Sequence, residues 1–271
     1  MSKLLMLWQK ALSQVQEVQK EPPLPSGLSV LDDIIWGLHK QEVLVIGGYP
    51  KTGKTSLVLN IAYHLADLHH KTCYFTLEMS EISLIKRLFS LVCGVEAEPV
   101  RRHQLDPFDI ETIKKAEGII KDIPLEIEFG RGYTPGDIGN YLLKKKPEVL
   151  IIDHIQAIRR LEGLSMVESI NEYITFLKKA SVKFDCAVVV CSQMTRVITG
   201  KRNEEYKDIE DSFTKGSRGI DESADTVLHL SWNQEKNEYK IIVKLQRDGE
   251  SGVANVQFIP HLYLFRNLER K

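Results

Sequence analysis

The sequence has few cysteines and almost no net charge. Four cysteines occur in 271 residues, and they form no C-x-x-C pair and lie near no histidines at metal-ligand spacing, which excludes a disulfide framework or a zinc site. We expect buried thiols at Cys73, Cys93, Cys186 and Cys191. The formal net charge of −1 excludes a global positive field that would hold nucleic acid by counterion release alone. Any nucleic-acid contact must come from a local patch, or from a patch that oligomerisation repeats.

Long apolar runs and a secretory signal are also missing. The longest apolar runs, such as 186–191 and 149–152, are far too short to cross a bilayer, and the first residues lack a small-residue cleavage site. We therefore expect no membrane span and a cytoplasmic location. The hydrophobic content of 43% is ample for one large α/β domain or two small ones.

The most informative stretch is Gly48 to Thr55, which has the spacing G-x-x-x-x-G-K-T. It follows the apolar run 43–46 and opens a helical pattern, the strand-loop-helix context of a phosphate-binding loop. Glycines at its two fixed positions let backbone N–H groups turn toward an anion, and the helix start adds its positive dipole end. We expect Lys54 to reach the β and γ phosphates and the Thr55 hydroxyl to bind Mg²⁺. The candidate nucleotide-binding residues are Gly48, Tyr49, Pro50, Lys51, Thr52, Gly53, Lys54, Thr55 and Ser56.

Three further candidates stand at the ends of apolar strand patterns. Asp153 ends the run 149–153 and is predicted to be the second magnesium-side residue. Glu78 follows 74–77 and is placed either to deprotonate the attacking water or to cap the next helix, two readings that spacing alone leaves equal. Gln193 follows 188–192, and its amide suits a sensor of the γ-phosphate.

The order of elements predicts an α/β fold with a mainly parallel sheet. Five strands alternate with helices, which indicates βαβ crossovers, and three later strands have no helical pattern between them and predict an antiparallel meander. The expected strands are 43–48, 72–77, 125–129, 149–153, 187–192, 226–232, 239–246 and 253–259. Residues 27–37 can form a helix.

The first 24 residues are expected to stand apart from the rest. Residues 3–19 carry an apolar stripe on one side of a helix, and a Pro-rich linker follows at 21–25. The helix either folds back on its own domain or docks on a neighbouring subunit, and we favour the second. This predicts a linker segment at 1–24 and an ATPase domain at 25–271.

Six short motifs together resemble the ATPase domain of DnaB-type replicative helicases, which have a RecA-like fold. They occur in the family's order and approximate spacing from about Pro25 to Phe265, and the leucine-glutamate-methionine-serine stretch is the most specific of them. The six motifs are 48–55, 75–80, 152–156, 192–193, 221–225 and 246–249. The resemblance implies ATP and Mg²⁺ as cofactors, and it implies that the first helix corresponds to the linker helix that docks on the adjacent protomer. No stretch resembles the family's N-terminal domain, which contacts primase.

The resemblance also assigns roles to single residues. It implies that Glu78 is the catalytic base, that Gln193 is the γ-phosphate sensor, and that Arg247 reaches the ATP of the neighbouring subunit. Such an arginine finger contributes about 10³ to 10⁵ in rate. Without the resemblance, Arg247 and Lys244 are ordinary exposed charges on a late strand.

DNA-facing loops of the family correspond to two places in this chain. One is the aperiodic segment after Gln193, and the other is 215–219, whose cations, hydroxyl and glycines can surround a phosphate. Repeated around a hexameric ring, these loops would line a basic channel although each chain is nearly neutral. The predicted DNA-binding residues are Arg196, Lys215, Ser217, Arg218 and Gly219.

Three departures from the family pattern bear on unwinding. The family's lysine two residues before the finger is Leu245 here, and Lys244 reaches the nucleotide only if a bulge corrects its face. His154 stands where tyrosine is common, and 215–219 differs from the usual arginine-glutamate-serine-glycine.

Two functions of different classes remain open. The first is a ring-forming, ATP-dependent DNA helicase or translocase on single-stranded DNA, of the 5′-to-3′ type by family resemblance, with a helicase loader or primase as possible partners. The alternative is a RecA-superfamily regulatory or assembly ATPase, similar to KaiC or RadA-related proteins, that does not unwind DNA.

Overall fold

The computed structural model describes residues 3–18, 22–194 and 223–268. Its single sheet has nine strands in the order β3-β2-β4-β5-β1-β6-β7-β8-β9. The strands are β1 (Val43–Gly48), β2 (Thr72–Thr76), β3 (Leu125–Phe129), β4 (Val149–Asp153), β5 (Ala187–Gln193), β6 (Thr226–Asn233), β7 (Glu238–Gln246), β8 (Gly252–Ile259) and β9 (Leu264–Asn267). β1 to β6 pair in parallel, and β6 to β9 pair antiparallel. The predicted α/β class and all eight predicted strands are confirmed, whereas β9 was not predicted.

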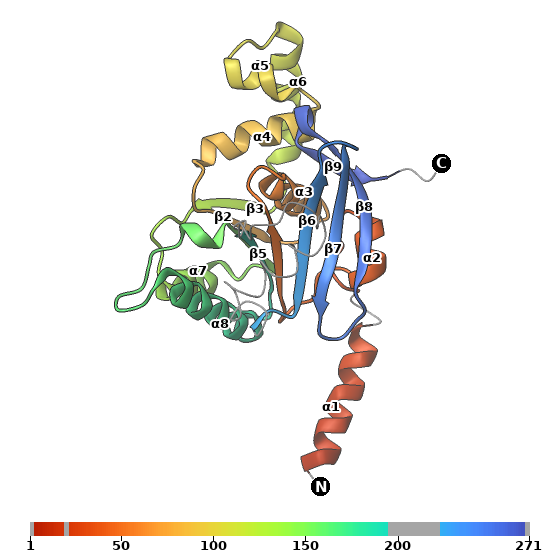
Figure 1. Ribbon diagram of the computed structural model, residues 1–271, viewed down its shortest axis with the longest axis vertical. Coiled ribbons are helices and arrows are strands. Elements are labelled where there is room, and N and C mark those ends of the chain that lie inside the picture. Colours follow the sequence, from red (N-terminus) through yellow and green to blue (C-terminus); the bar gives the residue numbers. More distant parts are fainter. Residues whose placement is uncertain (1–2, 19–21, 195–222, 269–271) are drawn as a thin grey trace, which may run out of the picture.

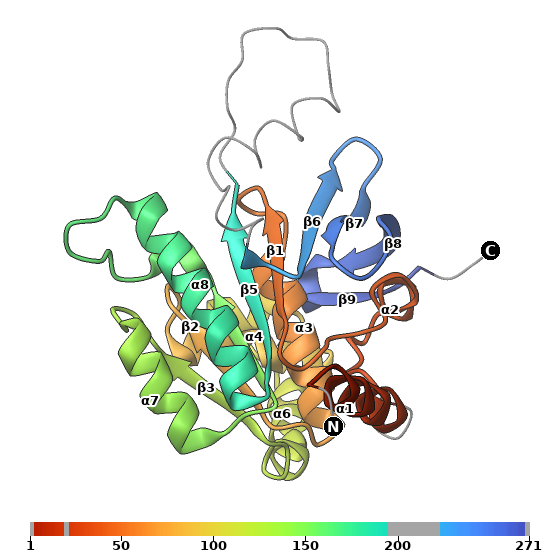
Figure 2. The same ribbon diagram turned by 90° about the horizontal axis from the view of Figure 1, so that it is seen from below.

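Helices cover both faces of the parallel strands (Figures 1 and 2). The helices of the described residues are α1 (Lys3–Val18), α2 (Ser29–Ile35), α3 (Lys54–Asp67), α4 (Glu81–Cys93), α5 (Ala97–Arg102), α6 (Pro107–Ile120), α7 (Pro135–Lys145) and α8 (Met166–Phe184), with 3₁₀ turns η1 (Ile155–Ala157) and η2 (Pro260–Leu262). One apolar core joins α2, α3 and α4 to one face of the sheet, and a second core joins α7 and α8 to the other. Because both faces are buried, the inner strands are continuous apolar runs.

The parallel arrangement brings the carboxyl ends of β1, β2, β4 and β5 to one edge of the sheet. Thr76 of β2 pairs with Asp153 of β4, and Gly48 of β1 pairs with Gln193 of β5. Residues that follow these strands are therefore neighbours, although they lie far apart in the sequence.

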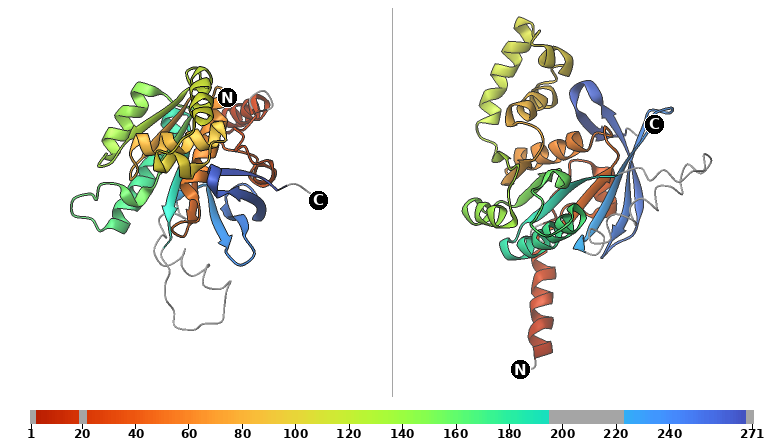
Figure 3. Two further views of the ribbon diagram at one scale, coloured as in Figure 1. Left: turned by 90° about the horizontal axis from the view of Figure 1, so that it is seen from above. Right: turned by 60° about the vertical axis from the view of Figure 1, so that its left-hand side comes forward.

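Helix α1 extends away from the sheet (Figures 1 and 3). Its described apolar side chains are exposed, with Leu4 74% and Trp8 70% exposed. Among the helices of the described residues, none has the length and apolar character that a membrane span needs.

The cysteines depart in one case from what the sequence indicated. Cys73, Cys186 and Cys191 are buried, but Cys93 is only half-buried. It is the last residue of α4, a helix with one apolar face, so its side chain lies at the margin of the core.

Candidate nucleotide-binding site

The loop between β1 and α3 has the geometry of a phosphate cradle. Gly53 precedes α3 with a φ of +95°, a conformation that strains other residues. A Cβ on Gly48 would lie 2.9 Å from the carbonyl oxygen of Leu230, so a side chain there would collide with β6. The N-terminus of the 14-residue α3 then opens directly onto the loop.

The Lys54 ammonium lies inside this loop. Its Nζ donates to the carbonyl oxygens of Gly48 at 2.7 Å and Tyr49 at 2.8 Å, and the Thr52 hydroxyl donates to the same Tyr49 carbonyl at 2.8 Å. Burial lowers the pKa of Lys54, and the charge of Asp153 opposes this shift. The Lys54 ammonium is therefore bound by carbonyl groups of the same loop in which it is expected to contact phosphate.

A pocket of about 520 Å³ opens beside the cradle, within the range of ordinary small-molecule sites. Its wall contains the predicted residues Pro50, Lys51, Gly53, Lys54, Thr55, Ser56, Glu78, Asp153 and Gln193. The structure thus brings together the cradle, the candidate metal-side carboxylate, the candidate base and the candidate sensor.

Glu78 and Asp153 differ sharply in environment. The Glu78 side chain is 68% exposed, and its Oε2 lies 3.4 Å from Nδ1 of His154. Asp153 is only 6% exposed and accepts a hydrogen bond from the Tyr74 hydroxyl at 2.8 Å.

Ser80, not Glu78, caps α4, since its side chain accepts from the N–H of Ser83. Of the two readings of Glu78, the helix cap is therefore wrong.

Gln156, which we did not predict as a site residue, forms hydrogen bonds with the backbone of Gln193. Nε2 of Gln156 donates to the Ser192 hydroxyl at 2.8 Å and to the Gln193 carbonyl at 3.2 Å, and Oε1 of Gln156 accepts from the Gln193 N–H at 2.9 Å. Gln156 lies in η1, just after Asp153 at the end of β4. It therefore ties the ends of β4 and β5 together.

Several other lining residues were also missed: Met79, Arg87, His154, Phe258, Pro260 and Tyr263. The Arg87 guanidinium carbon lies 5.0 Å from the centre of the Tyr263 ring. Asn60 of α3 fixes this turn, because its amide donates to the Tyr263 carbonyl at 2.7 Å and its oxygen accepts from the N–H of Phe265 at 2.9 Å. Nothing in the spacing of the sequence links residues 258–265 to the cradle.

Arg247 lies at the opposite edge of the sheet from the cradle of its own chain. It follows Gln246, which pairs with Thr226 at the beginning of β6, whereas the cradle follows the end of β1. Its backbone N–H donates to the carbonyl oxygen of Asp225 at 3.0 Å, and its guanidinium lies 3.8 Å from the Asp225 carboxylate. That carboxylate also accepts from Lys178 and from the N–H of Val43.

A bulge in β7 falls at Lys244. Val227 pairs with Leu245 and Leu228 pairs with Val243, so Lys244 is the additional residue. The bulge that would be needed to redirect Lys244 is therefore present. Neither Lys244 nor Arg247 lines the pocket of its own chain.

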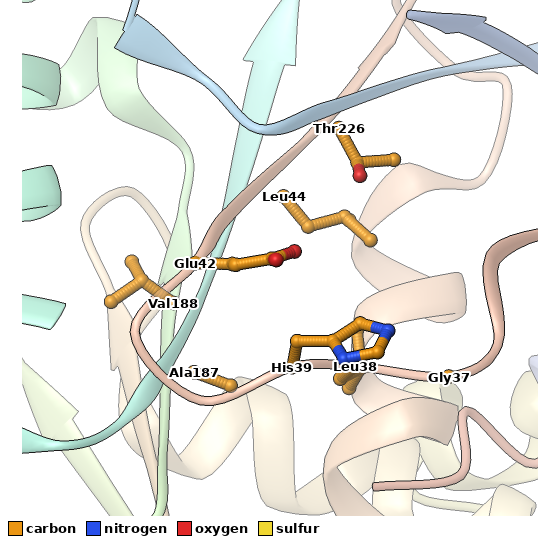
Figure 4. Close-up of a pocket in the computed structure, with 8 residues that line it drawn as sticks. All are labelled: Gly37, Leu38, His39, Glu42, Leu44, Ala187, Val188 and Thr226. Carbon is orange, nitrogen blue, oxygen red and sulfur yellow. The ribbon is translucent and has the colours of Figure 1, made fainter. Parts of the chain in front are cut away.

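A second recess lies at this opposite edge, beside the beginnings of β1, β5 and β6 (Figure 4). The Glu42 carboxylate points into it, and burial raises the pKa of Glu42. Its volume of about 10 Å³ is close to that of one water molecule, which excludes it as a nucleotide site.

The predicted DNA-binding residues Arg196, Lys215, Ser217, Arg218 and Gly219 lie outside the described part of the chain.

His229 supports the cradle from β6. It pairs with Gly47, is 1% exposed, and its ring centre lies 6.2 Å from that of Tyr49. Burial, followed by the charges of Lys244 and Lys54, lowers the pKa of His229 to about 4.

This shift predicts a loss of stability in acid. An unfolded histidine has a pKa of about 6.5, so the unfolded chain takes up the proton first, and stability present above that pH is lost as the pH falls toward 4. The resulting loss at pH 5 is about 2 kcal/mol. Urea unfolding of the parent and of His229→Gln at pH 8 and pH 5 measures it. We expect the free energy of unfolding to fall less between pH 8 and pH 5 in His229→Gln than in the parent. An equal fall in both proteins would show that His229 does not cause the loss.

Fold and pocket together define a P-loop nucleotide-binding protein with a RecA-like core. In structure, the chain matches a solved ATPase domain with a TM-score of 0.85 and 24% identity, covering 96% of this chain and 98% of that one. It also matches a solved structure described as a DnaB-like replicative helicase and its interactions with primase. The TM-score is 0.82 at 24% identity, and the match covers 96% of this chain and 66% of that one. At this identity the matches show the fold alone.

The chain belongs to the family described as DnaB-like helicase C terminal domain, whose model matches residues 23–267. Similar curated proteins include the replicative DNA helicase DnaB of Treponema pallidum, 28% identical over 87% of this chain, and that of Geobacillus stearothermophilus, 27% identical over 92%. A probable plasmid replicative DNA helicase of Chlamydia muridarum is 26% identical over 91%. The chain spans only 54% to 57% of the length of these relatives.

Proposed function

We propose that this chain is a ring-forming ATPase that hydrolyses ATP with Mg²⁺ between subunits and moves on single-stranded DNA. The observation that carries the proposal is the position of Arg247. The pocket of one chain contains a cradle, a carboxylate, a base and an amide, while the candidate arginine finger lies at the other edge of the sheet. A second copy is required to bring Arg247 to each ATP.

Metal binding is supported by the oxygen atoms of the pocket. The Thr55 hydroxyl and the Asp153 carboxylate belong to residues that line it, and Mg²⁺ prefers one or two such ligands together with phosphate oxygens and water. When bound, the ion neutralises charge that develops on the phosphate oxygens.

Hydrolysis is proposed to use Glu78 and Gln193. Glu78 accepts the proton of the attacking water at a carboxylate oxygen as the water oxygen bonds to the γ-phosphorus and the bond to ADP breaks. Gln193 lines both this pocket and a neighbouring recess that contains Arg131 and Arg159. If the Gln193 side chain changes its hydrogen-bond partner on hydrolysis, it can therefore alter contacts in the neighbouring recess, which suits a sensor of the γ-phosphate.

The wall formed by Tyr263 and Arg87 is proposed to take the adenine base, because an aromatic face with a cation over it favours a flat π-system. We expect Tyr263→Ala to weaken ATP binding about tenfold while kcat at saturating ATP stays within about twofold. Equilibrium binding of a fluorescent ATP analogue measures this. Tyr63→Ala is the control, because Tyr63 is a half-buried tyrosine of α3 that does not line the pocket. Equal weakening in both variants would remove Tyr263 from the site.

The action on DNA rests on the family and on the predicted loops at 196 and 215–219. ATPase rates with and without single-stranded DNA, followed by strand displacement on a forked duplex at several salt concentrations, test it. A helicase shows stimulation and displacement that falls steeply with salt. Hydrolysis without stimulation or displacement would favour an assembly ATPase instead. Primase or loader contacts, movement of the 5′-to-3′ type, the hexamer, docking of α1 on the next subunit and a cytoplasmic location belong to the same proposal.

A further inference from the structure

Tyr74 is a fully buried tyrosine whose hydroxyl faces the candidate metal site. It lies in β2 with 0% of its surface exposed, and its neighbours are the apolar core on the α3 face. Its Oη donates to Oδ2 of Asp153 at 2.8 Å. A phenol of the core therefore reaches a carboxylate at the edge of the nucleotide pocket.

Sheet register explains how the two residues meet. Thr76 of β2 stands directly beside Asp153 of β4, but its hydroxyl donates to the Met79 carbonyl at 2.7 Å. Tyr74 is two residues earlier on the same face, a diagonal separation that only a long or aromatic side chain spans. A phenylalanine at position 74 would keep the aromatic ring in the core but would provide no donor.

Two other side chains lie near the carboxylate. Cys191 of β5 also lies against Asp153, and its thiol is buried. Lys54 is within electrostatic reach, as its pKa shows. The Lys54 ammonium lines the same pocket as Asp153, whereas the Tyr74 hydroxyl holds Oδ2 of Asp153 as a neutral donor from the core.

We propose that Tyr74 is a positioning residue that fixes one oxygen of Asp153 and thereby prepares the carboxylate to bind Mg²⁺. This inference rests on the proposed function, since it takes Asp153 as the metal-side carboxylate. Partners that orient a metal ligand typically change metal affinity about 10- to 100-fold when removed.

The test is the strengthening of ADP binding by Mg²⁺ in the full chain, measured by calorimetry in excess Mg²⁺ and in EDTA. In EDTA, Tyr74→Phe should bind ADP like the parent, which would show that the cradle is intact. The factor by which Mg²⁺ raises the affinity for ADP should be about tenfold smaller in Tyr74→Phe than in the parent. Tyr173→Phe is a matched control, because Tyr173 is also 0% exposed and its hydroxyl donates to the backbone carbonyls of Tyr133 and Arg159.

Asp153→Asn separates the two claims. If Asp153→Asn abolishes the strengthening while Tyr74→Phe keeps the full parental value, or if Tyr173→Phe loses as much as Tyr74→Phe, the role of Tyr74 is overturned and the function stands. If Asp153→Asn also keeps the parental value, Asp153 is not the metal-side carboxylate, and both proposals fail at that residue.

Discussion

Replacement of Arg247 by alanine is expected to lower the rate of ATP hydrolysis by about 10³-fold or more and to leave ATP binding almost unchanged. The guanidinium is 47% exposed and makes a long, 3.8 Å ion pair with Asp225, so little folding energy is lost with it. It lies at the edge of the sheet away from its own cradle, where it cannot contribute to binding within one chain. Its effect should appear in kcat and not in the affinity of the isolated subunit.

Steady-state hydrolysis at saturating ATP, together with binding of an ATP analogue, measures this split. Arg266→Ala is the matched control, because Arg266 is an exposed arginine of β9 that bonds to Gln257. Parental kcat in Arg247→Ala would show that Arg247 is not the finger, and an equal loss in Arg266→Ala would show that the effect is not specific to position 247.

Glu78→Gln should produce the second large effect, a fall in kcat of about 10²- to 10⁴-fold. Glutamine keeps the size and the hydrogen-bonding reach of glutamate but does not accept the proton of the attacking water. The side chain is 68% exposed, and a glutamine oxygen can keep the contact with His154, so little folding energy is lost. KM for ATP should change little, because the carboxylate lies at the side of the pocket formed by β2 and not in the cradle loop.

A single-turnover experiment with pre-bound ATP separates chemistry from binding. Glu81→Gln provides the control, since Glu81 is an exposed residue in the first turn of α4, close to Glu78 in the sequence. The base assignment fails if Glu78→Gln turns over at the parental rate. It also fails if Glu81→Gln is as slow as Glu78→Gln.

Features that depend on residues close together in the sequence could be predicted from it. The strand, loop and helix around Gly48 to Thr55 follow from local pattern, and the structure gives β1 the predicted bounds, 43–48. Asp153 and Gln193 were predicted because the carboxyl ends of parallel strands must meet at one edge. The class of fold and the core of the site therefore rest on periodicity and one topological rule.

Features that depend on distant contacts could not be predicted. Tyr263 reaches the pocket only because Asn60 holds the turn before β9, a contact between residues 203 positions apart. Tyr74 reads as an ordinary strand residue, and its hydrogen bond depends on the register of β2 and β4. The bulge at Lys244 is likewise a property of pairing between β6 and β7, which a single strand does not encode.

Some expectations still await a measurement. The residues predicted to bind DNA lie outside the described part of the chain, and docking of α1 on another subunit stays a prediction. The exposure of Leu4 and Trp8 on α1 gives that helix an apolar face to bury, which favours an assembled form.

Mixing Lys54→Ala subunits with Arg247→Ala subunits tests the central claim, that each ATP site is completed by a neighbour. Neither variant alone has a complete site. In a mixed ring, an Arg247→Ala subunit supplies an intact cradle and an adjoining Lys54→Ala subunit supplies an intact finger, so about a quarter of the interfaces in a random equal mixture are complete. The account predicts that hydrolysis reappears on mixing. If the mixture stays as inactive as the two variants alone, although the subunits co-assemble, Arg247 does not act in the neighbouring site.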